Sequence, residues 1–195
     1  MILSLKNIVV LLIITLSGLA GSVIVGLMSY GGDVFSPLSP GFSFIAYGLS
    51  GGFIFAFYHV RGLSETITTA AVVSAIQFAI SSTWITVLAA GVWAFGVNLP
   101  VVAVAFIFER KLANLKQAKF VVVGLVYGAM FVLLTLLVAA LTGVERMPAE
   151  VFRGNFIDGL LIGLGLGVGI QGGEAFVHSV EHHRADKRAQ TKPSK

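Results

Sequence analysis

The stretch that decides the fold class is residues 66–108, which read TITTAAVVSAIQFAISSTWITVLAAGVWAFGVNLPVVAVAFIF. These 43 residues contain no Asp, Glu, Lys or Arg. A helix that crosses a bilayer uses about 20 apolar residues. The stretch is therefore about twice as long as one span, and it predicts two spans joined by a tight turn near residues 82–88.

Four further stretches are long and predominantly apolar, and three of them contain no Asp, Glu, Lys or Arg, whereas the last contains Asp158 and Glu174. They lie at residues 8–28, 42–58, 120–141 and 156–177. Together the stretches predict an all-α integral membrane protein, a bundle of six transmembrane helices. A cleaved signal peptide is the competing interpretation of residues 8–28, because Lys6 precedes an apolar run with small residues. The run continues to Met28, past the apolar region of a typical signal, so we expect a span.

The composition excludes several classes of protein. Of 195 residues, 56% are hydrophobic and only 11% are charged, whereas soluble domains contain roughly 25% charged residues. A soluble enzyme, a nucleic-acid-binding module and a disordered chain are therefore excluded. The absence of cysteine excludes a disulfide framework, thiolate metal sites and a cysteine nucleophile.

The basic residues orient the predicted bundle, since six spans put both termini on one side. Eleven of the 13 lie on that side: Lys6, Arg61, Arg110, Lys111, Lys116, Lys119, Arg184, Lys187, Arg188, Lys192 and Lys195. The positive-inside rule then predicts that both termini are cytoplasmic, in a multi-pass protein of the cell (inner) membrane. We expect residues 1–183 to form one transmembrane domain and residues 184–195 a basic cytoplasmic tail near anionic lipid.

Small residues recur at four-residue spacing in two of the predicted spans. The first span has Gly18, Ser22 and Gly26, and the sixth has two rows, Gly159, Gly163 and Gly167, then Gly165, Gly169 and Gly173. This spacing lets membrane helices approach closely. Two interpretations stay open: packing within the chain, and a docking surface for a partner membrane protein.

A few polar and aromatic side chains are candidates for a ligand site. Asn98 stands next to a break at Pro100, which is either a plain kink or an element that lines a site. Trp84 and Trp93 flank the predicted outer turn, where they serve either as an aromatic belt or for ligand stacking. Asp158 lies at the outer end of the sixth span, and Gln77 and Gln171 are uncharged alternatives.

The sixth span ends in the cluster most suggestive of metal chemistry. Glu174, His178 and His182 stand at i, i+4 and i+8, on one helical face, and His59 ends the second span on the same membrane side. These ligand types could bind a divalent metal or haem. The alternative is a solvated helix end followed by cations. No H-E-x-x-H, Walker A, G-x-G-x-x-G or G-x-S-x-G motif is present, so we expect no enzyme and no cofactor.

The region from Arg61 to Lys111 resembles a known transporter family. It has a basic residue that closes the second span, then Gly62, Glu65, an Ala-rich third span, Ser82-Thr83-Trp84 at an outer turn, Phe106-Ile107-Phe108 and a basic segment. The layout resembles the substrate-binding S-components of energy-coupling-factor (ECF) vitamin transporters, most closely the thiamine-precursor (hydroxymethylpyrimidine) type. The Gly-rich sixth span and its His/Glu end depart from that pattern.

The resemblance implies a subunit that binds a small water-soluble nutrient, a vitamin or its precursor, from outside the cell. It implies a ligand site in the outer half that draws on Trp84, Trp93, Asn98 and Asp158. It further implies that Gly18, Ser22 and Gly26 dock a transmembrane coupling protein, which works with ATPase subunits. Two alternatives remain: a non-catalytic membrane partner or assembly protein, and a membrane metal or haem protein that uses His59, Glu174, His178 and His182.

Overall fold

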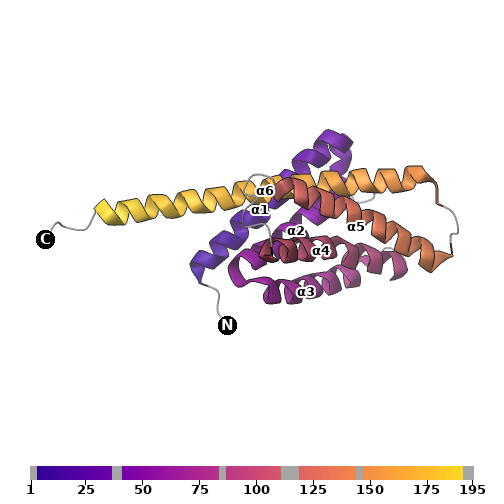
Figure 1. The fold of residues 1–195 in the computed structure, drawn as a ribbon, viewed down its shortest axis with the longest axis horizontal. Coiled ribbons are helices and arrows are strands. Elements are labelled where there is room, and N and C mark those ends of the chain that lie inside the picture. Colours follow the sequence, from indigo (N-terminus) through magenta and orange to yellow (C-terminus); the bar gives the residue numbers. More distant parts are fainter. Residues whose placement is uncertain (1–3, 37–40, 84–86, 111–118, 144–146, 191–195) are drawn as a thin grey trace.

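The computed structural model describes residues 4–36, 41–83, 87–110, 119–143 and 147–190. Within these ranges every regular element is helical. The elements are α1 (Leu5–Tyr30), the 3₁₀ helix η1 (Gly31–Phe35), α2 (Phe42–Arg61), α3 (Leu63–Ser81), α4 (Val87–Arg110), α5 (Lys119–Thr142) and α6 (Ala149–Gln190). Figure 1 shows the long helices running back and forth, with α6 extending beyond the others at the C-terminal end.

Five of these helices, α1, α2, α3, α5 and α6, are long and apolar enough to cross a membrane. The chain is thus an all-helical, multi-pass membrane protein. The uncharged stretch 66–108 divides as predicted, because α3 ends at Ser81 and α4 begins at Val87. Helix α4 has 24 residues and is apolar over Ala94–Ile107.

Helix α6 is much longer than the predicted span 156–177. Its 42 residues correspond to about 63 Å at 1.5 Å per residue, about twice the thickness of a hydrocarbon core. Hydropathy detects only the apolar part, whereas Glu, Arg, Lys, Ala and Gln after residue 180 are good helix formers that continue the helix. The helix therefore passes without interruption through residue 184, where the basic tail was predicted to begin.

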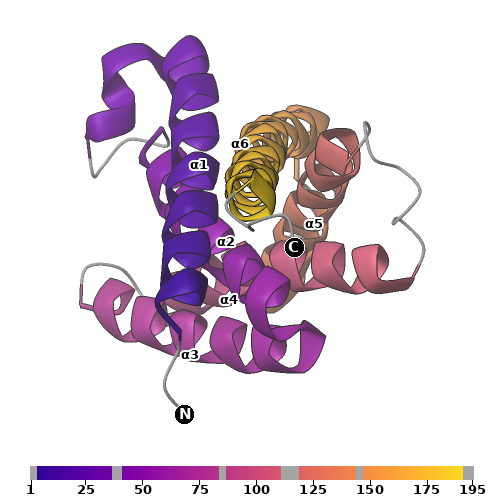
Figure 2. The same ribbon diagram turned by 90° about the vertical axis from the view of Figure 1, so that its left-hand side faces the viewer.

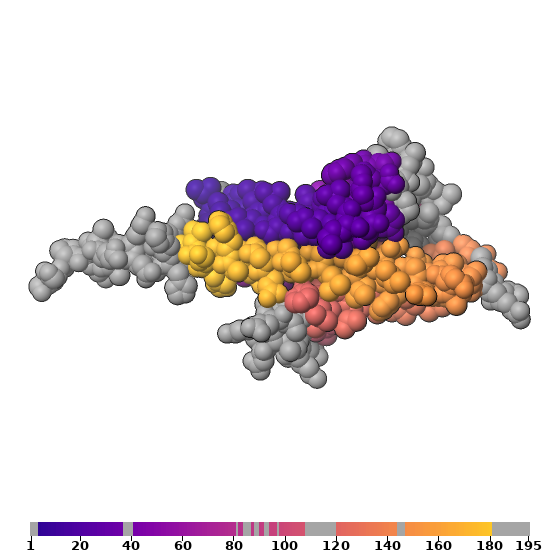
Figure 3. Space-filling model, turned by 90° about the horizontal axis from the view of Figure 1, so that it is seen from above, coloured from indigo at the N-terminus to yellow at the C-terminus, as the bar shows by residue number. Residues whose placement is uncertain are grey.

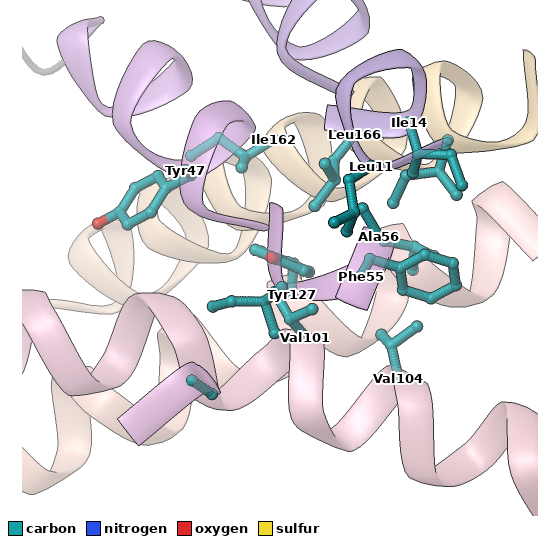
Figure 4. Packing of buried hydrophobic residues seen from close by; sticks show 14 of the residues in the cluster. Leu11, Ile14, Tyr47, Phe55, Ala56, Val101, Val104, Tyr127, Ile162 and Leu166 are labelled. Atoms are coloured by element: carbon teal, nitrogen blue, oxygen red, sulfur yellow. The ribbon is translucent and has the colours of Figure 1, made fainter. Parts of the chain in front are cut away.

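The helices are arranged around α2 and α6. Helix α6 packs between α1 and α5, α1 also packs along α2, and the α3–α4 hairpin packs against α2 and α5 (Figure 2). Figure 4 shows α2 at the centre of the apolar core, with Ile162 and Leu166 of α6 on one side and Val101 and Val104 of α4 on the other. This arrangement gives the core three layers of helix.

One glycine row of α6 faces α5. A Cβ atom built on Gly159, Gly163 or Gly167 would lie 2.7 Å from a backbone atom of α5 in each case. Real side-chain carbons do not come so close to backbone, so these three positions must lack a side chain for the two helices to touch. The row is the reason that α5 lies directly on α6.

The second glycine row of α6 faces α1. A Cβ on Gly165 would lie 2.7 Å from the carbonyl oxygen of Gly21, and one on Gly169 would lie 2.8 Å from the Cα of Gly18. A Cβ on Gly173 would lie 3.1 Å from the Cβ of Ser17. The two rows therefore use different faces of α6 to bring α1 and α5 to backbone contact.

These contacts predict different effects for two glycine substitutions on α6. We expect Gly163→Leu to lower the free energy of unfolding by roughly 1–3 kcal/mol or more, because the new side chain collides with α5. Gly172→Leu is the matched control, since a Cβ there has nothing within 4 Å. Unfolding in detergent, followed by circular dichroism, measures both. Equal destabilisation by the two variants would contradict the packing described.

Candidate functional site

A cleft of about 480 Å³ lies between α1, α2 and α3. It exists because α1 and α3 both pack against α2 but not against each other. Its lining consists of Thr15 from α1, of Ala46, Leu49, Ser50 and Phe53 from α2, and of Val73 and Gln77 from α3. These residues lie in the interior of their helices, so the cleft lies within the thickness of the membrane-spanning segments.

The lining combines apolar walls with three uncharged polar side chains, Thr15, Ser50 and Gln77. The Ser50 hydroxyl donates to the carbonyl oxygen of Ala46 at 2.8 Å. Thr15 is 8% exposed, and its Oγ1 has no hydrogen-bond partner within the described part of the chain. Such a lining can bind a ligand by apolar contact and a few hydrogen bonds, without acid–base chemistry.

The predicted site residue Asn98 does not line the cleft but bonds to Gln77, which does. Its Nδ2 atom lies 2.8 Å from Ser74 Oγ and 2.8 Å from Gln77 Oε1, both on α3, and 2.9 Å from the Ala94 carbonyl oxygen. Asn98 is only 1% exposed, and its own Oδ1 has no partner among the described residues. The amide therefore ties α4 to α3 and holds Gln77, which does line the cleft.

Of the other predicted ligand residues, Asp158 lies away from the cleft, and the side chains of Trp84 and Trp93 lie outside the described set. Asp158 accepts a hydrogen bond of 2.9 Å from the Tyr30 hydroxyl, which joins the start of α6 to the end of α1. Trp84 lies outside the described residues, and Trp93 is on α4 with its side chain outside the described set. Asn98 and Asp158, the two that can be followed, bond to different helices and do not share a cavity described here.

The small-residue face predicted to dock a partner is occupied within the chain. Gly18, Ser22 and Gly26 are all buried. The Ser22 hydroxyl donates to the Phe44 carbonyl oxygen at 2.7 Å, and a Cβ on Gly26 would lie 2.8 Å from the Phe44 side chain. Of the two interpretations left open by the sequence, packing within the chain is the one observed for this face.

Two members of the predicted His/Glu cluster, His59 and Glu174, are in contact in the described part of the chain. His59 Nδ1 lies 3.6 Å from Glu174 Oε1, which links α2 to α6. The His178 side chain is exposed, and the His182 side chain lies outside the described set. No group of three or more His, Cys, Asp or Glu suited to a metal ion occurs among the described residues.

Sequence reasoning missed two of the polar residues at the cleft, Thr15 and Ser50. Each is one of several hydroxyl residues inside an apolar span, and Ser or Thr is common there because its hydroxyl can bond the preceding turn. The only signal was their position near the middle of a span.

The chain was compared with known proteins at three levels. No protein-family model, no curated protein and no solved structure matches it. The resemblance of residues 61–111 to transporter S-components therefore remains a prediction from sequence pattern.

The Asn98 network predicts a measurable coupling between α3 and α4. We expect Asn98→Leu to lower the free energy of unfolding by roughly 1 kcal/mol, which is typical of hydrogen bonds between membrane helices. In a Ser74→Ala, Gln77→Leu background the same change should cost clearly less, because both of its acceptors on α3 are gone. Detergent unfolding of the unmodified protein and the three variants in this cycle measures the coupling, and strictly additive effects would show that the network contributes nothing.

Proposed function

We propose that the chain is the small-molecule-binding subunit of a membrane transport system, for a small water-soluble nutrient such as a vitamin or its precursor. The cleft between α1, α2 and α3 is the observation that carries this proposal. Its volume of about 480 Å³ falls in the range typical of small-molecule sites. Its lining offers apolar contact and uncharged hydrogen-bonding groups, which suit binding and release better than chemical conversion.

The proposed protein has six spans, with α4 as the sixth beside the five that meet the length and hydropathy criterion. Both termini are cytoplasmic and the protein resides in the cell (inner) membrane. The distribution of basic residues along the sequence supports this orientation. In this proposal the energy for uptake comes from a separate transmembrane coupling protein with ATPase subunits, as the resemblance of residues 61–111 to transporter S-components implies.

In this proposal the residues that line the cleft contact the ligand, in place of the residues expected from the sequence. Gln77, Ser50 and Thr15 provide the hydrogen-bonding groups, and Asn98 acts as a positioning residue for Gln77. The Asp158–Tyr30 hydrogen bond joins α1 to α6. In this proposal Asp158 does not contact the ligand. Thr15 Oγ1 has no hydrogen-bond partner among the described residues, which supports this assignment, since a buried hydroxyl without a partner is costly in an apolar medium.

Native mass spectrometry of gently solubilised protein, with small-molecule and metal analysis of the same sample, tests the proposal. We expect one organic molecule retained per chain. Leu49→Trp, which fills the cleft, should abolish retention, whereas Leu133→Trp should not. Leu133 is a matched control because it is a similarly exposed leucine on α5, outside the cleft: 56% exposed against 49% for Leu49.

Four other results would contradict the proposal. An empty protein, or retention that survives Leu49→Trp, would remove the cleft as the site. Metal or haem at one per chain would favour the alternative that uses His59, Glu174, His178 and His182. A fixed membrane partner without ligand or ATPase subunits would favour the assembly-protein alternative.

A further inference from the structure

A second, smaller groove runs between the start of α1 and the end of the apolar part of α6. Its volume is about 170 Å³, and its lining is Leu5, Lys6, Val9, Val10 and Ile13 from α1 with Val177 and Val180 from α6. Figure 3 shows these two segments, in indigo and yellow, side by side on one face of the molecule. The groove is separate from the cleft proposed for the nutrient.

The groove is open to its surroundings, and apolar except at one point. Leu5 is 77% exposed and Val9 is 45% exposed, so the chain itself does not cover these walls. Lys6 is the one charged residue among the seven, and its side chain is exposed. An apolar trough with a cation at its end matches a molecule that has a long apolar part and an anionic end.

Helix register places further charged residues on α6 beyond the groove. Residues at spacings of three and four occupy one helical face. Val177, Val180, Arg184 and Lys187 follow that spacing, and so does one acidic residue, Glu181, four residues after Val177. Helix α6 continues without interruption to Gln190. Arg184 and Lys187 thus continue, one and two turns further on, the face of α6 whose valines line the groove.

We propose that this groove binds one anionic phospholipid from the surrounding bilayer. An acyl chain lies along Val9, Ile13 and Val177, and the phosphate lies near Lys6 at the end of the bundle. Burial of acyl carbon in the groove supplies apolar contact, and basic residues at the membrane surface attract anionic lipid. The bound lipid bridges α1 and α6 where α6 leaves the bundle. This proposal does not depend on the proposed transport function.

The test uses the full-length protein in vesicles of equal parts phosphatidylcholine and phosphatidylglycerol. After extraction into detergent, native mass spectrometry counts the retained lipids of each class. We expect one phosphatidylglycerol per chain, retained in clear excess over phosphatidylcholine. The variant K6Q/R184Q/K187Q should reduce that preference on the order of tenfold, because basic residues near the surface dominate the attraction.

Two matched controls distinguish binding in this groove from two other effects. One is attraction of lipid by the total positive charge, and the other is the introduction of a tryptophan at any exposed valine. K111Q/K116Q/K119Q removes two cations from the segment that joins α4 to α5 and one from the first residue of α5, and it should leave the preference intact. Val9→Trp fills the groove without changing charge and should reduce retention. Val121→Trp changes a similarly exposed valine on α5 (40% against 45%) and should not.

The outcomes that overturn the proposal are specific. Retention of the two lipids in their mixing ratio by the unmodified protein would show that the groove does not select an anionic headgroup. An equal loss in both triple variants would show that total charge alone attracts the lipid. An equal effect of Val9→Trp and Val121→Trp would show that the acyl chain does not occupy the groove.

Discussion

The rest of the structure depends on backbone contact at two faces of α6. Lipid tails are as apolar as leucine, so membrane helices gain little from the hydrophobic effect and associate through close packing instead. Because Gly163 has no side chain, the backbone of α5 contacts α6 there at Val123. In the same way α1 contacts α6 at Gly169, next to Gly18. Any side chain at these positions would hold the helices apart, so α6 acts as the common surface on which α1 and α5 are placed.

The position of α1 in turn determines the cleft. A Cβ on Gly52 of α2 would lie 2.9 Å from the Thr15 carbonyl oxygen, so α1 is held against α2 as well as against α6. Helix α3 packs on α2 separately and is tied to α4 through Asn98. The space left between α1 and α3 is the cleft, with Gln77 on one wall and Thr15 on the other.

The sequence predicted the membrane class and the break between Ser81 and Val87, because apolar length and charge are local properties of the chain. It predicted the glycine rows but not their partners, since those depend on the rotation of each helix in the bundle. The same reason hid Ser74 and Gln77 as partners of Asn98. The sequence predicted an apolar span at 156–177 but not the full length of α6, because hydropathy detects only the apolar segment, while the helix continues through charged residues.

The most direct test of this account is cysteine cross-linking in native membranes, which is clean because the chain has no cysteine. A Cβ on Gly173 would lie 3.1 Å from the Ser17 Cβ, close to the separation that a disulfide requires. Ser17→Cys/Gly173→Cys should therefore cross-link α1 to α6 on mild oxidation, whereas Ser17→Cys/Gly172→Cys should not. Equal cross-linking of both pairs, or a link only through residue 172, would contradict the arrangement of α1 on the glycine face of α6.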